Sequence, residues 1–331
     1  MRQELLWGSE AMVRSAVPTG SNDLETPRSD PPQPDKPARP RRARELQDPL
    51  NHYLYHPLAW QLARQLAKTP LTPNMVSVIG ALFVVGAAIA YTLPGWPLTA
   101  AIGLALHMSW HVVDGADGDL ARLTGRASPV GELVDGVCDY TSHIVLYLIL
   151  GWLLAGSIGG AAYWWMLGAG LSHIVQSNHV EVQRRSYQWW VYGTPWLRNT
   201  HAQAQSATAK GFFGAIVSGY LRLASGMTPH ALRIDAAVEA AQGDPARLKD
   251  IRTAVAAEAP PLLLMCKLLG PNPRAIVLGL AMLAAGLATD TAGRGALWYF
   301  MYQAIILNQL LAGSVLMHNA AGRRIAARIG V

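Results

Sequence analysis

Long runs of apolar residues recur along the chain and are separated by short polar connections. Each run is near the roughly 20 residues that a helix needs to cross a bilayer. The six runs cover residues 75–93, 97–113, 133–154, 160–180, 274–289 and 296–318. The pattern predicts an all-α integral membrane protein with about six transmembrane helices.

The residues before the first apolar run have a different periodicity. Between residues 52 and 68, Leu58, Leu62 and Leu66 recur at helical spacing among polar and charged positions. This pattern predicts an N-terminal amphipathic helix on the membrane surface. Residues 69–74 (TPLTPN) follow with two prolines, which we expect to end this helix and to begin the first membrane helix.

Two polar regions interrupt or precede the membrane pattern. Residues 1–48 are rich in proline and arginine and contain no hydrophobic run, which predicts a disordered cytoplasmic tail rather than a signal peptide. Residues 49–331 then form one membrane domain with a long cytoplasmic insertion at about 184–270. Within the insertion we expect an aromatic stretch in the headgroup layer at 187–196, a short interfacial helix at 211–224 and a charged, alanine-rich helix at 233–258.

Composition and charge agree with a membrane protein. The 331 residues are 51% hydrophobic and 15% charged, with a net charge of +6. The connections near 94–97 and 155–160 contain no lysine or arginine, so the positive-inside rule predicts that both termini and the opposite connections are cytoplasmic. The positive excess therefore favours contact with anionic lipid over nucleic acid. Cys138 and Cys266 form neither a disulfide framework nor a metal-ligand pair.

Four aspartates are concentrated between the second and third apolar runs. On a helix, Asp114 and Asp117 share a face, as do Asp135 and Asp139 on the next helix. Placing carboxylates next to membrane segments costs free energy, so such residues usually have a function. Oxygen-only clusters bind hard cations such as Mg²⁺ or Mn²⁺, and four carboxylates are enough for two ions. The spacing thus indicates a two-metal site suited to phosphoryl-transfer chemistry.

Small and basic residues lie between the two acidic pairs. Gly118 follows Asp114 by one turn, and its missing side chain allows a ligand to approach the backbone. Arg122 lies one turn further, where its guanidinium could bind a phosphate resting on Gly118. Gly131 precedes Asp135 by one turn and could make the matching gap on the second helix.

The complete pattern, Asp114-x2-Asp117-Gly118-x2-Ala121-Arg122-x8-Gly131-x3-Asp135-x3-Asp139, resembles the signature of the class I CDP-alcohol phosphotransferase (CDP-alcohol phosphatidyltransferase) family. The surrounding apolar pattern extends the resemblance to roughly residues 50–320.

Several expectations follow from this resemblance alone. It implies a membrane transferase that moves a substituted phosphate group from a CDP-linked alcohol to the hydroxyl of an alcohol or lipid acceptor and releases CMP. The four aspartates would hold two Mg²⁺ or Mn²⁺ ions, and Asp139 would also be the general base. Gly118, Ala121, Arg122 and Gly131 would bind the CDP group. Members of the family pair as homodimers, which we expect here too.

The identity of the two alcohols stays open at this point. CDP-diacylglycerol with a soluble acceptor is favoured, and a soluble CDP-alcohol with a lipid acceptor is the alternative. Residues 128–135 resemble the choline and ethanolamine phosphotransferase branch, in which the glutamate matching Glu132 lies in the site. That branch has a histidine where this chain has Gly136. A divalent-cation transporter is a further alternative, although its ligands would be expected near the bilayer midplane. A catalytically silent scaffold is disfavoured by the intact motif.

A few more side chains are weaker candidates. His111 and His143 are spaced to face the aspartates, as second-shell partners, proton acceptors or packing residues. Arg184 and Arg185 could bind an acceptor phosphate, but anchoring at the membrane edge is favoured. Asp119 does not lie on the helix face that Asp114 and Asp117 share, which indicates a solvated or positioning charge. The composition, without a targeting peptide, favours a bacterial cytoplasmic membrane.

Overall fold

The computed structural model describes residues 43–194, 219, 222–223, 226–288 and 292–331. Helices dominate these residues, and no strand occurs among them. The predicted all-α class is therefore confirmed. The predicted tail lies outside the described residues up to position 42. From Ala43 onward the chain is described and includes a short 3-10 helix at Arg44–Leu46.

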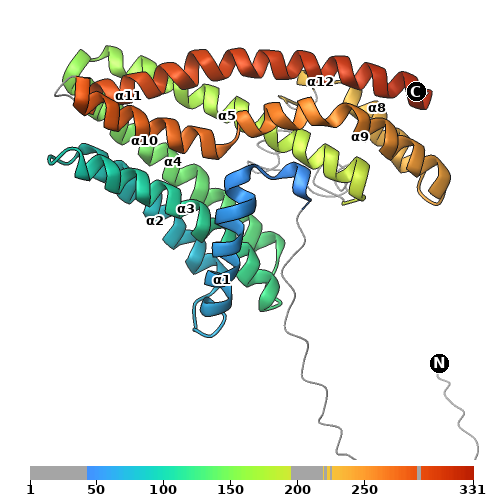
Figure 1. The fold of residues 1–331 in the computed structure, drawn as a ribbon, viewed down its shortest axis with the longest axis horizontal. Helices are drawn as coiled ribbons and strands as arrows, with labels where there is room; N and C mark the ends of the chain where they lie inside the picture. Colours follow the sequence, from blue (N-terminus) through green and yellow to red (C-terminus); the bar gives the residue numbers. More distant parts are fainter. Residues whose placement is uncertain (1–42, 195–218, 220–221, 224–225, 289–291) are drawn as a thin grey trace, which may run out of the picture. The chain divides into compact units, whose positions relative to one another are not determined.

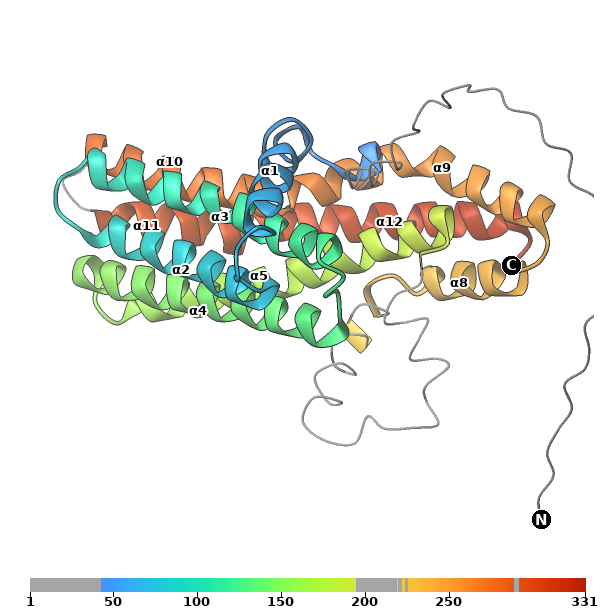
Figure 2. The same ribbon diagram turned by 90° about the horizontal axis from the view of Figure 1, so that it is seen from below.

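Long helices form the main body of the protein (Figure 1). In order along the chain these are α2 (Pro73–Thr92), α3 (Leu98–Leu123), α4 (Pro129–Ile158), α5 (Ala161–Tyr187), α10 (Pro271–Ala288), α11 (Ala292–Met301) and α12 (Leu307–Ile329), with a π-helical turn at Tyr302–Ile306 between the last two. The views in Figures 1 and 2 agree that α2 and α3 lie side by side. Buried residues such as Leu146, Leu150, Leu278 and Phe300 form the core between these helices.

Four stretches of the described residues are long and apolar enough to cross a membrane. They are Pro73–Thr92, Val130–Ile158, Pro245–Leu287 and Gly293–Ile329. The predicted number of six spans is therefore not confirmed. α3 and α5 are also long, but each mixes its apolar residues with polar side chains, such as His107 and His111 on α3 and His173 and Ser177 on α5.

The predicted break between the surface helix and the first membrane helix is confirmed. α1 (His56–Leu66) follows a π-helical turn at Asn51–Tyr55 and ends before the proline pair. α2 begins at Pro73, and the Thr72 side chain accepts a hydrogen bond from the Met75 amide at 3.3 Å. A threonine cap followed by proline satisfies the free amides of a helix start.

α1 packs across α3 through small residues. Ala59 and Ala63 are fully buried, and a β-carbon on Gly115 of α3 would lie 3.1 Å from that of Ala59. Leu58 on another face of α1 is 40% exposed. The amphipathic helix is confirmed, while its position on a membrane surface stays a prediction.

The described part of the insertion packs on the C-terminal half of α12. A π-helical turn (Gln188–Tyr192), α8 (His230–Ala240) and α9 (Pro245–Leu268) share a second core that includes Trp189, Ile234, Ile251, Val255 and Ile325. The predicted helix at 233–258 is thus two helices, with Gly243 in the left-handed region (φ +94°) at the turn between them. Trp196 and most of 211–224 lie outside the described residues.

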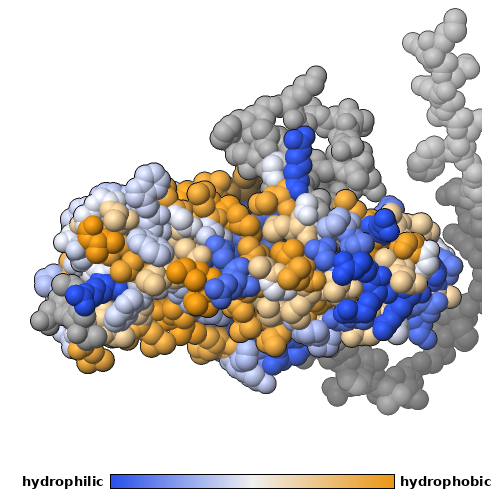
Figure 3. Space-filling model, turned by 90° about the horizontal axis from the view of Figure 1, so that it is seen from above, coloured by the Kyte–Doolittle hydropathy of each residue, from blue (hydrophilic) through white to orange (hydrophobic). Residues whose placement is uncertain are grey.

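The surface changes character along the molecule. Figure 3 shows hydrophobic side chains over much of the drawn face and hydrophilic ones gathered toward the end where α8, α9 and the C-terminus lie. This end carries an exposed ion pair between Arg324 of α12 and Glu258 of α9, with N and O atoms 2.6 Å apart. The polar end is therefore the part of this surface best suited to water.

Candidate active site

Three of the predicted metal ligands meet where α3 and α4 face each other. Asp114, Asp135 and Asp139 each offer a carboxylate oxygen, and these oxygens all lie within 4.8 Å of one another. All three residues are partly buried. The one-turn spacings in the sequence, together with the packing of two helices, thus bring these carboxylates to one point.

Asp117 lies beside this group. Its carboxyl is within hydrogen-bonding reach of Asp135, and it accepts a 2.5 Å hydrogen bond from the hydroxyl of Ser77 on α2. The Asp117 carboxyl also accepts from the amide of Gly118. Because Asp117 is only 5% exposed, these contacts fix its carboxyl in one direction. Asp117 is therefore adjacent to the three-carboxylate group without belonging to it.

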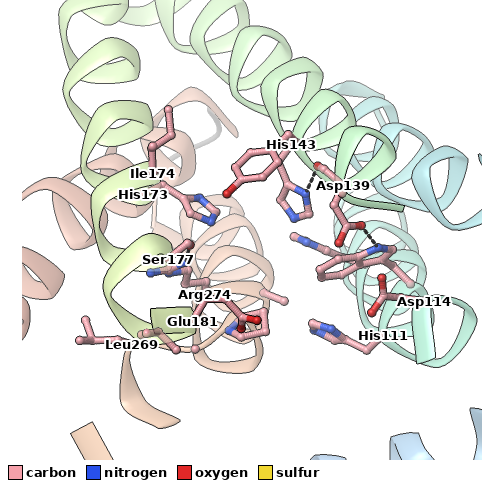
Figure 4. Close-up of a pocket in the computed structure, with 18 of the residues that line it drawn as sticks. His111, Asp114, Asp139, His143, His173, Ile174, Ser177, Glu181, Leu269 and Arg274 are labelled. Carbon is pink, nitrogen blue, oxygen red and sulfur yellow. Dashed lines mark hydrogen bonds between the residues drawn. The ribbon is translucent and has the colours of Figure 1, made fainter. Parts of the chain in front are cut away.

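Asp139 is held by residues on both helices. The indole N–H of Trp110 on α3 donates to Oδ1 of Asp139 at 3.2 Å. One turn along α4, Nδ1 of His143 lies 2.8 Å from the backbone carbonyl oxygen of Asp139, a contact drawn in Figure 4. The Trp110 contact leaves the second oxygen of Asp139 for other partners.

The carboxylates open onto a large cavity. It has a volume of about 690 Å³ and extends from Asp114 and Asp139 across to α5 and the start of α10. In Figure 4, Asp114, Asp139 and His111 lie opposite Arg274, Ser177 and Glu181. His107, His111, His143 and His173 all line this cavity. The acidic group therefore faces a space large enough for a substrate and lined by further polar groups.

Comparison with known proteins identifies the family to which the region around the aspartates is similar. Residues 70–224 match the family model of CDP-alcohol phosphatidyltransferase, and this stretch includes all four aspartates. The stretch is a CDP-alcohol phosphatidyltransferase domain. The resemblance stated from the motif is thereby confirmed. With its four membrane-capable stretches and this domain, the chain is an integral membrane protein.

Two relatives share part of this domain. An uncharacterized CDP-alcohol phosphatidyltransferase class-I family protein of Schizosaccharomyces pombe is 32% identical over 113 residues, which are 30% of this chain and 28% of that protein. A phosphatidylinositol phosphate synthase of Corynebacterium glutamicum is 26% identical over 106 residues, which are 32% of this chain and 42% of that protein. The chain thus spans less than half the length of these relatives.

The small and basic residues of the phosphatidyltransferase signature lie near the aspartates. A β-carbon on Gly118 would lie 3.5 Å from the Arg122 guanidinium, so this arginine folds back over the bare backbone of Gly118. Ala121 is partly buried on the same helix. A β-carbon on Gly131 would lie 3.4 Å from the Ser128 hydroxyl. Gly118 and Arg122 are therefore brought together as their spacing predicted.

Asp119 is a positioning charge rather than a solvated one. Its carboxylate is 2% exposed and lies 2.5 Å from the Arg122 guanidinium, whose own side chain is half exposed. A buried carboxylate pairing with an accessible guanidinium restrains the arginine at one end. Of the two roles expected for Asp119, the solvated charge is excluded because its side chain is 2% exposed.

Arg184 and Arg185 make local contacts at the end of α5. Each lies close to Glu181, with N and O atoms 2.8 Å and 2.7 Å apart. Burial alone would raise the pKa of Glu181, but the two guanidinium groups outweigh it and keep that pKa below its ordinary value. Glu132 of the phosphatidyltransferase domain is exposed one turn before Gly136.

Sequence reasoning missed three side chains that contact or face the site. Ser77 and Trp110 bind the aspartates from outside the signature, and Arg274 lies 135 residues beyond Asp139 in the chain. Helical spacing carries no signal for such contacts, because they depend on which helices pack together.

Proposed function

We propose that this protein is a phospholipid-synthesising transferase. It moves a phosphatidyl or phospho-alcohol group from a CDP-linked alcohol to an acceptor hydroxyl and releases CMP. The observation that carries the proposal is the cluster of Asp114, Asp135 and Asp139 in a CDP-alcohol phosphatidyltransferase domain, beside a cavity of about 690 Å³ that Asp114 and Asp139 line. The similarity to a phosphatidylinositol phosphate synthase supports the same reaction class.

The donor set of the site fits divalent cations. The three clustered carboxylates, with Asp117 beside them, offer only oxygen ligands, which suits Mg²⁺ or Mn²⁺. We assign two ions to Asp114, Asp117, Asp135 and Asp139. When bound, such ions polarise phosphoryl oxygens and neutralise charge on the leaving group. The contacts from Ser77 and Trp110 would keep the ligands oriented.

The CDP group is assigned to the other signature residues. The bare backbone of Gly118 and the guanidinium of Arg122 form one side of this subsite, and Ala121 and Gly131 complete it. Asp119 restrains Arg122 while leaving half of its side chain accessible. A charge-assisted hydrogen bond from an arginine to a phosphate is stronger than one from a neutral donor.

Asp139 is the general base in this proposal. It takes the proton from the acceptor hydroxyl as that oxygen attacks the phosphorus of the donor. A new phosphorus–oxygen ester bond forms, the phosphoanhydride bond to CMP breaks, and CMP leaves. The hydrogen bond from Trp110 to one Asp139 oxygen orients this carboxylate. Positioning of the acceptor beside this carboxylate supplies much of the rate enhancement.

A lipid substrate is supported by the side of the cavity formed by α4 and α5. The apolar lining residues Ile144, Leu148, Leu167 and Leu171 are between 49% and 64% exposed, so the same residues face the cavity and the outside. Such an apolar opening on a membrane-capable helix suits acyl chains. We favour CDP-diacylglycerol as the donor; a CDP-choline or CDP-ethanolamine type donor with a lipid acceptor is the alternative.

The remaining assignments follow from this function. We place both termini and the active site on the cytoplasmic side of a bacterial membrane, where a water-soluble acceptor and CMP can exchange. Pairing as a homodimer is part of the proposal. A divalent-cation transporter is disfavoured, because the aspartates share their region with Gly118 and Arg122, which cation transport does not require.

The test is release of CMP by the purified protein in lipid bilayers. CDP-diacylglycerol and CDP-choline type donors would be supplied with pools of acceptors, with and without Mg²⁺ or Mn²⁺. We expect metal-dependent release with one donor and one acceptor. We also expect Asp139→Asn to abolish release while the circular dichroism and melting of the protein are retained. Substantial activity in Asp139→Asn would remove the role of this residue as the base.

A further inference from the structure

The segment that precedes α1 forms part of the cavity wall, and we call residues 44–55 the strap. It consists of the 3-10 turn at Arg44–Leu46, an extended residue at Gln47 and the π-helical turn at Asn51–Tyr55. Its residues Leu46, Asp48 and Asn51 line the cavity together with residues of α5, α9 and α10. Figures 1 and 2 show this blue segment running from α1 toward α9.

One end of the strap is fixed to the aspartate side of the cavity. Tyr55 is only 3% exposed, and its hydroxyl donates to the sulfur of Met108 on α3 at 3.7 Å. Its ring packs against His111, also on α3, with the ring centroids 5.0 Å apart. A buried aromatic ring cannot leave such a place without exposing a large apolar surface. This end of the strap therefore moves only with α1 and α3.

The other end is held to the opposite wall by a few polar contacts. Glu45 accepts hydrogen bonds from the hydroxyl of Tyr187 at the end of α5, at 3.3 Å, and from that of Tyr192 in the π-helical turn that follows. Asp48 accepts one from the side-chain amide of Asn272 on the first turn of α10, at 2.8 Å. Because Tyr192 is 48% exposed, water can compete for its hydrogen bond. This end can therefore be released.

Asp48 keeps its place in the strap when it is not bound to α10. Its Oδ1 accepts from the backbone amide of Asn51 at 3.0 Å, and its Oδ2 accepts from the Asn51 side chain at 2.8 Å. These contacts lie within the strap, so they survive when the bond to Asn272 breaks. Leu46 adds an apolar contact with the second core. Release thus breaks few contacts and leaves the turn at Asn51 intact.

The two sides of the cavity differ in polarity. On the α4 and α5 side its lining includes the exposed apolar residues Ile144 and Leu148. Near the strap the lining is polar and includes Asn51, Arg184 and Lys267. CMP carries a charged phosphate, and moving such a group across an apolar surface is costly. CMP should therefore leave on the polar side, which the strap crosses from α3 to α5 and α10.

We propose that the strap is a gate at the polar side of the cavity. It is closed when Asp48 is bound to Asn272 and Glu45 to the two tyrosines. It opens by swinging on its Tyr55 end, which lets a water-soluble substrate enter and the product leave. The identity of that product as CMP rests on the proposed function, whereas the movement itself does not. A closed gate would keep water from competing with the acceptor hydroxyl for the donor phosphorus.

The first experiment uses the native thiol of Cys266 as a reporter of opening. Cys266 lines the cavity and is 7% exposed. With Cys138 replaced by alanine, Cys266 is the single thiol of the chain. A charged, water-soluble thiosulfonate would be added to the protein in lipid bilayers. Since the reagent reaches this thiol through the polar side, the labelling rate should follow the population of the open form.

Two variants weaken different contacts of the strap. Asn272→Ala removes the bond to Asp48 and leaves the Asp48–Asn51 contacts in place. Tyr192→Phe removes one donor to Glu45, and Tyr163→Phe, at an exposed position near the start of α5, is its matched control. We expect both strap variants to be labelled about tenfold faster than the wild type, because each loses a hydrogen bond to a charged group. Rates equal to that of Tyr163→Phe in both variants would overturn the gate.

The second experiment locks the strap. Asp48→Cys and Asn272→Cys are combined with Cys138→Ala and Cys266→Ala, and a short bifunctional thiosulfonate joins the two new thiols. We expect cross-linking to abolish CMP release and a reductant to restore it. The matched control has Asp48→Cys without Asn272→Cys and should be insensitive to the reagent. Undiminished release from the cross-linked protein would contradict the gate, because turnover would then need no opening.

The labelling measurement separates this inference from the proposed function. If no donor yields CMP, the transferase proposal fails, and the labelling rates of Cys266 still decide whether the strap opens. If Asn272→Ala does not fold, Tyr192→Phe carries the test, because its half-exposed ring can lose a hydroxyl without disturbing the core.

Discussion

The indole of Trp110 is the clearest example of a single side chain that prepares the site. Its N–H donates a hydrogen bond to Asp139, and the residue is 6% exposed, so water cannot replace this donor easily. Loss of this donor leaves the Asp139 carboxylate free to turn away from the acceptor. Orientation of a reacting group within a narrow range is a large part of enzymatic rate enhancement.

We therefore expect Trp110→Phe to lower kcat by roughly 10- to 100-fold, the range of a hydrogen bond to a charged group. The KM for the donor should change little, because the proposed CDP subsite does not include Trp110. Steady-state CMP release checks this. Trp164→Phe, at a position that is 78% exposed, is the matched control and should behave as wild type. A fall in both variants would point to general loss of stability.

At this scale the sequence was informative only about neighbours on one helix. The i, i+3 and i, i+4 spacings predicted that all four aspartates converge, because a helix places such residues on one face. Asp114, Asp135 and Asp139 do so, while Asp117 lies beside them. The same periodicity holds no information on Trp110 meeting Asp139, or on Arg274 facing the carboxylates. Those contacts depend on the packing of α3, α4 and α10, which hydrophobic spacing does not specify.

At the scale of elements, polar residues explain why the membrane helices were only partly predictable. α2 contributes the single polar contact of Ser77 to the aspartates and keeps the apolar run that hydropathy finds. By contrast, α3 and α5 supply polar side chains to the cavity, such as His107 and His173, and these dilute their apolar character. The start of α2 was predicted, because proline after Thr72 marks a helix start by local chemistry alone. Proline also follows the caps Ser128 and Asp244 at the starts of α4 and α9, although one continuous helix was predicted across Asp244.

Close packing of α10 against α11 depends on Gly295. A β-carbon there would lie 2.8 Å from the backbone oxygen of Ala281 and 3.0 Å from the Cα atom of Met282, so neither contact can be relieved by rotating a side chain. We expect Gly295→Ala to lower the free energy of unfolding by about 1–3 kcal/mol. Gly156→Ala on α4, with nothing within 4 Å, should be neutral or stabilising. Thermal unfolding of both variants in detergent tests this, and equal melting temperatures would contradict the packing argument.

For the whole molecule, the carboxylate group is a source of instability that a bound cation removes. Several acidic groups within a few ångströms repel one another, and this repulsion is present only in the folded protein. A cation that binds the folded state alone raises its stability according to its affinity, by about 2.7 kcal/mol at a concentration 100 times the Kd. The same arrangement that serves catalysis should thus link metal binding to the stability of the fold.

We expect saturating Mg²⁺ or Mn²⁺ to raise the melting temperature by about 5 °C and chelation to reverse it. Because general screening by salt also weakens carboxylate repulsion, the comparison is made against NaCl at equal ionic strength. In Asp135→Asn the repulsion and one ligand are both removed, so the apo protein should melt higher than the wild type while the divalent-specific increase is lost. An equal response to NaCl and to Mg²⁺ or Mn²⁺ in the wild type would mean that the acidic group attracts counter-ions without binding a metal, and the two-ion assignment would then have to be abandoned.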